Sequence, residues 1–259
     1  MIELFNTVLF EPIFNLLMVV YHYLPPHDLG ISIIVVTLVL KLLLYLPSLS
    51  SIRSQQAMQE IQPKLDALRK KYEKNKEELS RQLVSFYKEN KISPFSSCLP
   101  LLIQFPILLA LFRVFIAVSG TDADTGILPA EQLEHLYGTF KETYASTPID
   151  TTLLGFVDLA QTKNYIMAGL AAGLQFWQSR MMMKRNKKTA TKNIAQSMSQ
   201  QMIYLMPVMT FIFGVTFPAG LTLYWATSTL FQVAQQYMFI RLQKKDKETS
   251  TGDREQTVN

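Results

Sequence analysis

Lys41 is the residue whose type and place most need a chemical explanation. It is the only charged side chain between residues 30 and 52, and insertion scales put the cost of a lysine at the centre of a membrane helix at roughly 2.5–3.5 kcal/mol. Thr37, Tyr45 and Ser48 share its helical face and form one polar stripe with it. Ionisable residues in membrane segments usually face a bundle interior or a wet cavity. We therefore expect a hydrated cavity around Lys41, open toward the cytoplasm.

Polar side chains recur inside the other apolar runs. They are Gln104, then Gln175 and Gln178, then Thr222, Trp225, Thr229, Gln232 and Gln236. No Asp or Glu occurs in these runs to pair with Lys41. For each Gln or Thr the ordinary alternative is hydrogen bonding between helices. For Lys41 the alternative is snorkelling toward the membrane surface, which is the favoured interpretation for Arg113, late in its own run.

Nothing in the sequence is typical of an enzyme or a metal site. Cys98 is the only cysteine, which excludes an intramolecular disulfide. There is no HExxH, GxSxG or phosphate-loop motif, and no carboxylate pair within an apolar run. We therefore expect no catalytic residue, no metal and no cofactor. The net charge of +5 comes from basic residues beside apolar runs, so we expect no nucleic-acid function.

The apolar runs that must position these residues are long enough to cross a bilayer. Of the 259 residues 49% are hydrophobic, and the mean hydropathy is +0.14. A hydrocarbon core of about 30 Å requires a helix of roughly 20 apolar residues. The last run is too long for one span and is interrupted by FPAG at 217–220. We predict five membrane-spanning helices, at about 30–51, 98–119, 164–183, 202–217 and 220–240.

Residues 1–29 do not fit this pattern. Glu3, Glu11 and Pro12 interrupt their apolar sequence, and they lack the basic start of a secretory signal. We interpret them as a helix in the outer membrane interface, with a sixth span as the alternative. The segment 1–29 contains no Lys or Arg, whereas 53–91 contains ten. Because Lys and Arg near span ends stay in the cytoplasm, we predict an external N-terminus and a cytoplasmic C-terminus.

The segments between the spans complete the predicted organisation. The basic segment 53–95 is dense in good helix formers and predicts a cytoplasmic helical hairpin that breaks near Asn75. We expect an outer loop at 120–163, a second cytoplasmic loop at 184–200 and a disordered cytoplasmic tail at 241–259. The predicted fold class is all-α: a polytopic five-helix membrane bundle with a cytoplasmic helical hairpin and an N-terminal interfacial helix.

Three sequence motifs occur in the order and spacing of a known family. They are AMQEIQPKLDALRKKY, then YKENKISPFSSCLPLLIQFPILLALFRV, then FPAGLTLYW followed by QQY. In these motifs the chain resembles the YidC/Oxa/Alb membrane protein insertases, over nearly all of residues 31–241. The resemblance implies that residues 30–240 form a five-helix insertase core around a hydrophilic groove, open to the cytoplasm and to lipid. It is to the short bacterial type, without the large periplasmic domain.

The resemblance also implies a set of site residues. The family's groove arginine falls on Lys41, so the positive charge is kept while the planar five-donor fork of arginine is lost. The other groove and substrate-contact positions fall on Thr37, Gln104, Gln175 and Trp225.

The function implied is that of an insertase and chaperone. It would move nascent transmembrane segments from the cytoplasm into a bacterial plasma membrane, alone or with the Sec translocon. The implied partners are nascent membrane proteins, lipids, the Sec translocon, the ribosome and the signal-recognition-particle pathway, and the implied working unit is a monomer. The alternative is a small-solute or anion transporter that uses Lys41 as its binding site. Such a transporter would be expected to show an inverted repeat, and the two halves of the sequence show none.

Overall fold

The protein is built almost entirely of helices. The computed structural model describes residues 2–90, 99–121, 125–183 and 194–256. Cys98, the end of the predicted hairpin and most of the predicted loop 184–200 lie outside the described residues. The described elements are α1 (Ile2–Phe5), η1 (Asn6–Phe10), α2 (Glu11–Tyr23), α3 (Leu29–Leu43), α4 (Tyr45–Lys71), α5 (Lys76–Glu89), α6 (Leu99–Ser119), α7 (Ala130–Leu133), α8 (Thr139–Tyr144), β1 (Thr152–Leu153), β2 (Val157–Asp158), α9 (Tyr165–Met183), α10 (Ile194–Thr216) and α11 (Ala219–Gln256).

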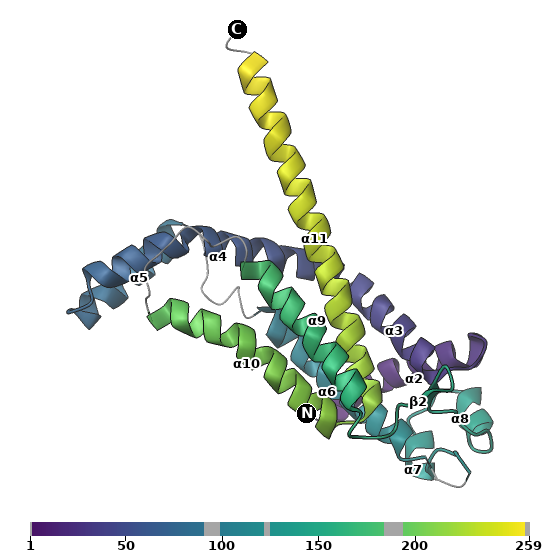
Figure 1. Ribbon diagram of the computed structural model, residues 1–259. Coiled ribbons are helices and arrows are strands. Elements are labelled where there is room, and N and C mark those ends of the chain that lie inside the picture. The colour runs from purple at the N-terminus through teal and green to yellow at the C-terminus, as the bar shows by residue number, and fades with distance from the viewer. Residues whose placement is uncertain (1, 91–98, 122–124, 184–193, 257–259) are drawn as a thin grey trace.

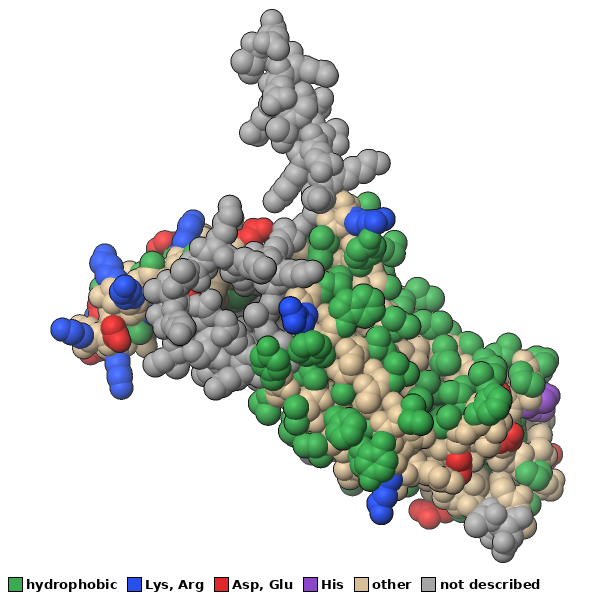
Figure 2. All heavy atoms as spheres, viewed as in Figure 1, with side chains coloured by type: hydrophobic (Ala, Val, Ile, Leu, Met, Phe, Trp, Pro, Cys, Tyr) green, Lys and Arg blue, Asp and Glu red, His purple; other side chains and the backbone are tan. Residues whose placement is uncertain are grey.

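The helices form one elongated body with different structures at its two ends. α9 packs against both α10 and α11, and α11 also packs against α3 and α6. The hairpin of α4 and α5 extends from one end of this body, while α7, α8 and β2 lie at the other (Figure 1). Hydrophobic side chains cover much of the body between these ends, and charged side chains gather on the hairpin (Figure 2).

Two helices in the described part of the chain are long and apolar enough to cross a membrane, namely Ile2–Tyr23 and Leu102–Ser119. A third candidate is the bent pair formed by Leu29–Leu43 and Tyr45–Met58, and Tyr204–Thr216 is a shorter apolar helix. The all-α membrane fold class is therefore confirmed. The count of five spans stays a prediction.

The first predicted span is bent, and proline accounts for the bend. α3 ends at Leu43, and α4 leaves it at an angle of 67°. The backbone ladder is intact on both sides, where Leu44 N–H donates to Leu40 at 3.1 Å and Ser48 N–H donates to Leu44 at 3.0 Å. Pro47 has no N–H for the Leu43 carbonyl, and its ring crowds that carbonyl. The helix therefore breaks one turn before the proline.

The bend changes two predictions made from helical spacing. Thr37 and Lys41 share α3, but Tyr45 and Ser48 belong to α4, so the predicted four-residue stripe does not continue along one helix. α4 also runs unbroken through residue 53, where the hairpin was predicted to begin. The break near Asn75 is confirmed, because α5 starts just after Asn75, whose side-chain oxygen accepts the Glu78 N–H at 3.1 Å.

The predicted disordered tail differs from the structure as well. α11 continues from Ala219 to Gln256 and so covers most of the segment 241–259. No proline follows Pro218, and Lys, Arg, Glu and Gln, which are good helix formers, are frequent after residue 241. The local sequence therefore permits the last helix to continue past its apolar part.

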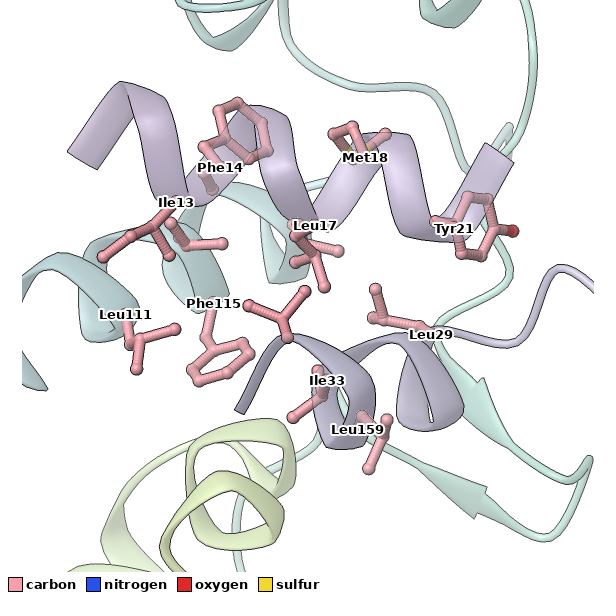
Figure 3. Packing of buried hydrophobic residues seen from close by; sticks show 14 of the residues in the cluster. Ile13, Phe14, Leu17, Met18, Tyr21, Leu29, Ile33, Leu111, Phe115 and Leu159 are labelled. Atoms are coloured by element: carbon pink, nitrogen blue, oxygen red, sulfur yellow. The ribbon is translucent and has the colours of Figure 1, made fainter. Parts of the chain in front are cut away.

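The hydrophobic core gathers where α2 crosses the ends of α3 and α6. Figure 3 shows one face of α2 pointing at side chains of these two helices and of the outer segment. The labelled buried residues are Ile13, Phe14, Leu17, Met18, Tyr21, Leu29, Ile33, Leu111, Phe115 and Leu159. Burial of such side chains contributes about 1.5–3 kcal/mol each, so α2 is held firmly to the bundle.

Residues 125–163, which belong to the predicted outer loop and are called the outer segment, are folded and lie along the polar face of α2. The Asn15 side chain donates to the His135 carbonyl at 2.8 Å and accepts the Tyr137 N–H at 2.7 Å. One turn earlier Glu11 lies 3.1 Å from His135 Nδ1, and further along the Tyr21 hydroxyl accepts the Asp150 N–H at 2.8 Å. A helix bonded to this segment over several turns is expected to lie beside it at the outer surface. The interfacial interpretation of α2 therefore stays our prediction.

Tyr144 anchors the outer segment in the core. Its side chain is buried, and its hydroxyl lies 3.4 Å from Nδ1 of His22. Burial raises the pKa of Tyr144 to about 12, so the phenol is neutral at any physiological pH. The outer segment thus contributes an uncharged aromatic ring to the core.

Gly30 is expected to be intolerant of a side chain. An added Cβ would lie 2.4 Å from Leu153 Cδ1 and 2.7 Å from Leu153 Cβ. We expect Gly30→Ala to destabilise the protein by about 1–3 kcal/mol through overpacking, measured by thermal unfolding in mild detergent. In the matched control Gly169→Ala the new Cβ meets nothing within 4 Å. Equal stabilities for the two variants would contradict the close packing of α3 on Leu153.

Candidate functional site

Lys41 is buried and bonded to a neutral side chain from another helix. It is only 8% exposed, and its Nζ donates to Oε1 of Gln104, on α6, at 3.0 Å. The amide group of Gln104 donates in turn to the hydroxyl of Tyr224 on α11. Ser228, one turn further along α11, also lies near enough to interact with this hydroxyl. We call these four residues the Lys41 network. It joins α3, α6 and α11.

The charge of Lys41 is not neutralised in the described part of the structure. The ion pairs described there are Arg69–Asp66, Arg81–Glu77, His135–Glu11 and Lys141–Glu134. An ammonium has three N–H donors, and the bond to Gln104 uses one of them. Lys41 also lies in the last turn of α3, where the helix dipole favours a cation by about 0.3–1 kcal/mol. The helix end and the amide oxygen stabilise the charge without cancelling it.

Thr37 lies one helical turn from Lys41 but is not bonded to the network. Its side chain is buried, and its hydroxyl donates to the carbonyl of Ile33 in the same helix at 2.6 Å. This local bond is a common way for a threonine to satisfy its hydroxyl inside an apolar helix. The structure therefore places Thr37 beside the site, with its donor already engaged.

Trp225 faces a different neighbour from the Lys41 network. Its ring stacks on Phe213 of α10, with ring centres 6.4 Å apart, and Phe213 also stacks on Phe217. Successive residues of a helix point about 100° apart, since one turn takes 3.6 residues. Tyr224 can therefore reach Gln104 while Trp225 packs against α10. The resemblance places Trp225 and Lys41 along one groove, and the contacts of the described residues do not join the two side chains directly.

Gln175 likewise stands apart from Lys41. Its carbonyl accepts the Ser179 hydroxyl at 2.9 Å, and its half-buried side chain makes no hydrogen bond within the described residues. The neighbouring Gln178 instead donates to Gln232 of α11 at 2.8 Å. Of the five predicted site residues, the structure thus joins Lys41 and Gln104 directly and leaves the other three outside the network.

Three functional candidates escaped the sequence analysis. Tyr224 and Ser228 lie beside the row of residues that the sequence analysis selected on the last helix, which includes Trp225. A tyrosine within an apolar run does not stand out as a polar residue. Gln235 accepts the Ser48 hydroxyl at 2.8 Å and donates to the Tyr45 carbonyl at 3.4 Å. It therefore holds the start of α4 against α11 just beyond the bend. The sequence could have indicated Gln235, because it is a glutamine within an apolar helix.

Arg113, for which snorkelling was predicted, is bonded to the N-terminal helices. Its guanidinium donates to the side-chain oxygen of Asn6. It also lies 4.6 Å from the ring centre of Phe10 and 6.0 Å from that of Phe5, within range of a cation–π interaction. Arg113 thus ties the outer part of α6 to the N-terminal helices.

Metal chemistry has no visible site in the part of the chain that the structure describes, where no cluster of three or more His, Cys, Asp or Glu side chains could hold a metal ion. The fold and the site together define a polytopic α-helical membrane protein with a buried lysine on an interior polar network, and no described residue forms an ion pair with this lysine. The family follows from comparison. The model of the 60Kd inner membrane protein family, also called the YidC/Oxa1 family, matches residues 19–247, and the chain belongs to this family.

Relatives with curated names agree with this assignment. A protein of Fusobacterium nucleatum named Membrane protein insertase YidC is 31% identical over 83% of this chain and 87% of its own length. A Clostridium perfringens protein with the same name is 33% identical over 83% of this chain and 79% of its own length. The chain spans about half (51%) of a Streptomyces avermitilis protein of that name, with 30% identity. The protein is thus a membrane-embedded relative of insertases.

Gln104 is expected to be the residue on which the network depends most. Gln104→Leu would remove the described hydrogen-bond acceptor of Lys41 and a hydrogen bond of Tyr224. Because hydrogen bonds to charged groups contribute roughly 1.5–3 kcal/mol, we expect a loss of stability of about that size, measured by unfolding in mild detergent. Gln175→Leu is the matched control, since it removes the same side chain from a half-buried position outside the network. Similar losses of stability in both variants would show that the network contributes no more to stability than a glutamine outside it.

Proposed function

We propose that this protein is a membrane protein insertase and chaperone that moves nascent transmembrane segments from the cytoplasm into the bilayer. The observation that carries the proposal is the Lys41 network, found in a chain that belongs to the YidC/Oxa1 family. A buried cation with N–H donors that no described residue occupies is suited to hold a polar or acidic peptide for a short time.

The first step is capture of the polar part of a nascent segment. A short acidic or polar stretch approaches Lys41 from the cytoplasm through a hydrated groove between the helices. An acidic side chain or a peptide carbonyl then accepts a hydrogen bond from the ammonium. This contact lowers the cost of bringing polar backbone partway into the bilayer, where each unsatisfied group would otherwise cost several kcal/mol.

The second step is release of the apolar part of the segment into lipid. Transfer of apolar surface out of water contributes about 25 cal/mol per Å², so a hydrophobic helix leaves the groove spontaneously. Trp225 and the exposed apolar residues of α9 and α10 would guide it toward lipid. They include Ile166, Leu170, Trp177, Leu205, Val208 and Ile212. This mechanism uses no nucleotide and no catalytic residue.

Lysine in place of arginine gives this site its own character. An arginine binds a carboxylate through two parallel N–H groups, whereas lysine is a compact charge on a flexible stem. Lys41 therefore holds its partners with less geometric selectivity. Weak and unselective binding suits a site that must release many different peptides.

Cellular context follows from the same proposal. The protein acts in the bacterial plasma membrane, with its N-terminus outside and its C-terminus in the cytoplasm, in agreement with the excess of Lys and Arg in 53–91. It works as a monomer, alone or with the Sec translocon, and receives chains from the ribosome and the signal-recognition-particle pathway. Thr37, Gln104, Gln175 and Trp225 line its groove together with Lys41.

Substitution of Lys41 tests the proposal directly. We expect Lys41→Arg to retain insertion of single-span substrates, because it keeps the charge, and Lys41→Ala to lower the yield on the order of tenfold, which corresponds to about 1.4 kcal/mol of lost binding. The measurement is protease protection of a newly made substrate in proteoliposomes that contain the purified protein. Lys70→Ala, which removes an exposed lysine of α4, is the matched control and should insert normally.

Three results would count against this function. One is equal insertion by Lys41→Ala and the unaltered protein. Another is failure of the unaltered protein to insert any single-span substrate. The third is anion or solute flux into proteoliposomes that lack nascent chains, abolished by Lys41→Ala, which would favour the transporter alternative.

A further inference from the structure

The turn between β1 and β2 exposes two apolar side chains at its tip. The strands pair Thr152 with Asp158 and Leu153 with Val157, which leaves Leu154, Gly155 and Phe156 in the turn. Phe156 is 90% exposed and Leu154 is 60% exposed. If the turn lay in water, these two side chains would stay exposed. Phe and Leu, however, are among the residues most often buried inside proteins.

The backbone of this turn is held in an unusual conformation. Leu154 has a φ of +51° and Gly155 a φ of +72°. Glycine adopts this left-handed region easily, but a leucine rarely does. Strained backbone of this kind persists only where the surrounding structure enforces it, and it often marks a functional position. Here it displays Leu154 beside Phe156.

Asp28 and Leu153 fix the turn to the start of α3. One carboxylate oxygen of Asp28 caps α3 by accepting the Ile31 N–H at 2.8 Å, and the other accepts the Leu154 N–H. The Leu153 side chain packs on Gly30 at a place where a Cβ would not fit. The turn therefore moves as one body with the first residues of α3.

The other side of the hairpin is joined to three more helix ends. The Leu159 carbonyl accepts the Gly220 N–H at 2.9 Å, and the Gln161 carbonyl accepts the Ala219 N–H at 2.9 Å. Lys163 N–H donates to the Val215 carbonyl at 2.9 Å, just before α9 begins. The hairpin is thus attached where α3, α9 and α11 begin and α10 ends. These are the outer ends of four predicted spans.

We propose that the turn 154–156 is a membrane anchor whose side chains insert into the outer leaflet of the bilayer. Its base is fixed at the ends of the helices, so its tip lies at the level of the membrane boundary. Residues 153–157 carry no charge, and Phe and Leu bind the interfacial region favourably. Two side chains are far too small a surface for a stable protein partner, which requires about 800 Å² on each side. The inference is independent of the insertase function.

Depth-dependent fluorescence quenching tests the anchor. Trp177→Phe and Trp225→Phe remove both native tryptophans, and Phe156→Trp then places a single reporter at the tip. In liposomes whose lipids carry bromine on the acyl chains, we expect this tryptophan to lose at least half of its emission, with little quenching by aqueous iodide. Glu142→Trp, in the same background, is the matched control. It lies at an exposed position of α8 in the outer segment and should show the reverse pattern.

Two outcomes would overturn the proposal. If Phe156→Trp is quenched by iodide as strongly as Glu142→Trp and is insensitive to brominated lipid, the tip lies in water. If it is shielded from iodide only at high protein-to-lipid ratios and brominated lipid has no effect, a second copy of the chain covers it. Since Phe156 is almost fully exposed, its substitution is not expected to unfold the protein, and equal thermal stability of the variants checks this.

Discussion

The structure depends on how the ammonium group of Lys41 is accommodated inside an apolar bundle. Its described partner is the amide oxygen of Gln104, which is neutral. A carboxylate at that place would have stabilised lysine more strongly, but it would also have neutralised the charge and closed the site to other anions. A neutral partner fixes the position of the cation and leaves its field intact. Burial, charge and the single described hydrogen bond are the features on which the proposed binding of a passing polar group rests.

Backbone geometry contributes to the same result. The break that Pro47 causes after Leu43 puts Lys41 in the last turn of α3, where the carbonyl ends of the helix favour a cation. Gln235 then fixes the first turn of α4 against α11 through Ser48 and the Tyr45 carbonyl. A straight helix would have lacked this helix end near the lysine. One proline thus ends the helix next to the lysine and redirects the chain into the hairpin of α4 and α5.

Different kinds of interaction stabilise the two ends of the molecule. At the outer end, α2 and the segment 125–163 bury a continuous apolar core, and the Arg113 guanidinium ties this core to Asn6. Further along α9 and α11, contacts between helices include polar pairs such as Gln178 with Gln232. An apolar core packs to high density and excludes water, whereas polar pairs can exchange their partners for water or a peptide. The two ends of the bundle therefore differ in the kind of contact that holds the helices together.

The sequence by itself determined the class of the protein, because long uncharged runs and a charge bias between loops are local features that the bilayer imposes on any chain. It also identified Lys41 and Gln104, since a charge and an amide stand out in apolar surroundings. The sequence did not reveal that Tyr224 joins them, that Trp225 turns toward α10, or that Arg113 binds Asn6. Those contacts depend on how helices that are distant in the chain rotate and cross. They also depend on the bend between α3 and α4, whose angle cannot be derived from the spacing of apolar residues. Only tertiary packing decides which faces of such helices meet.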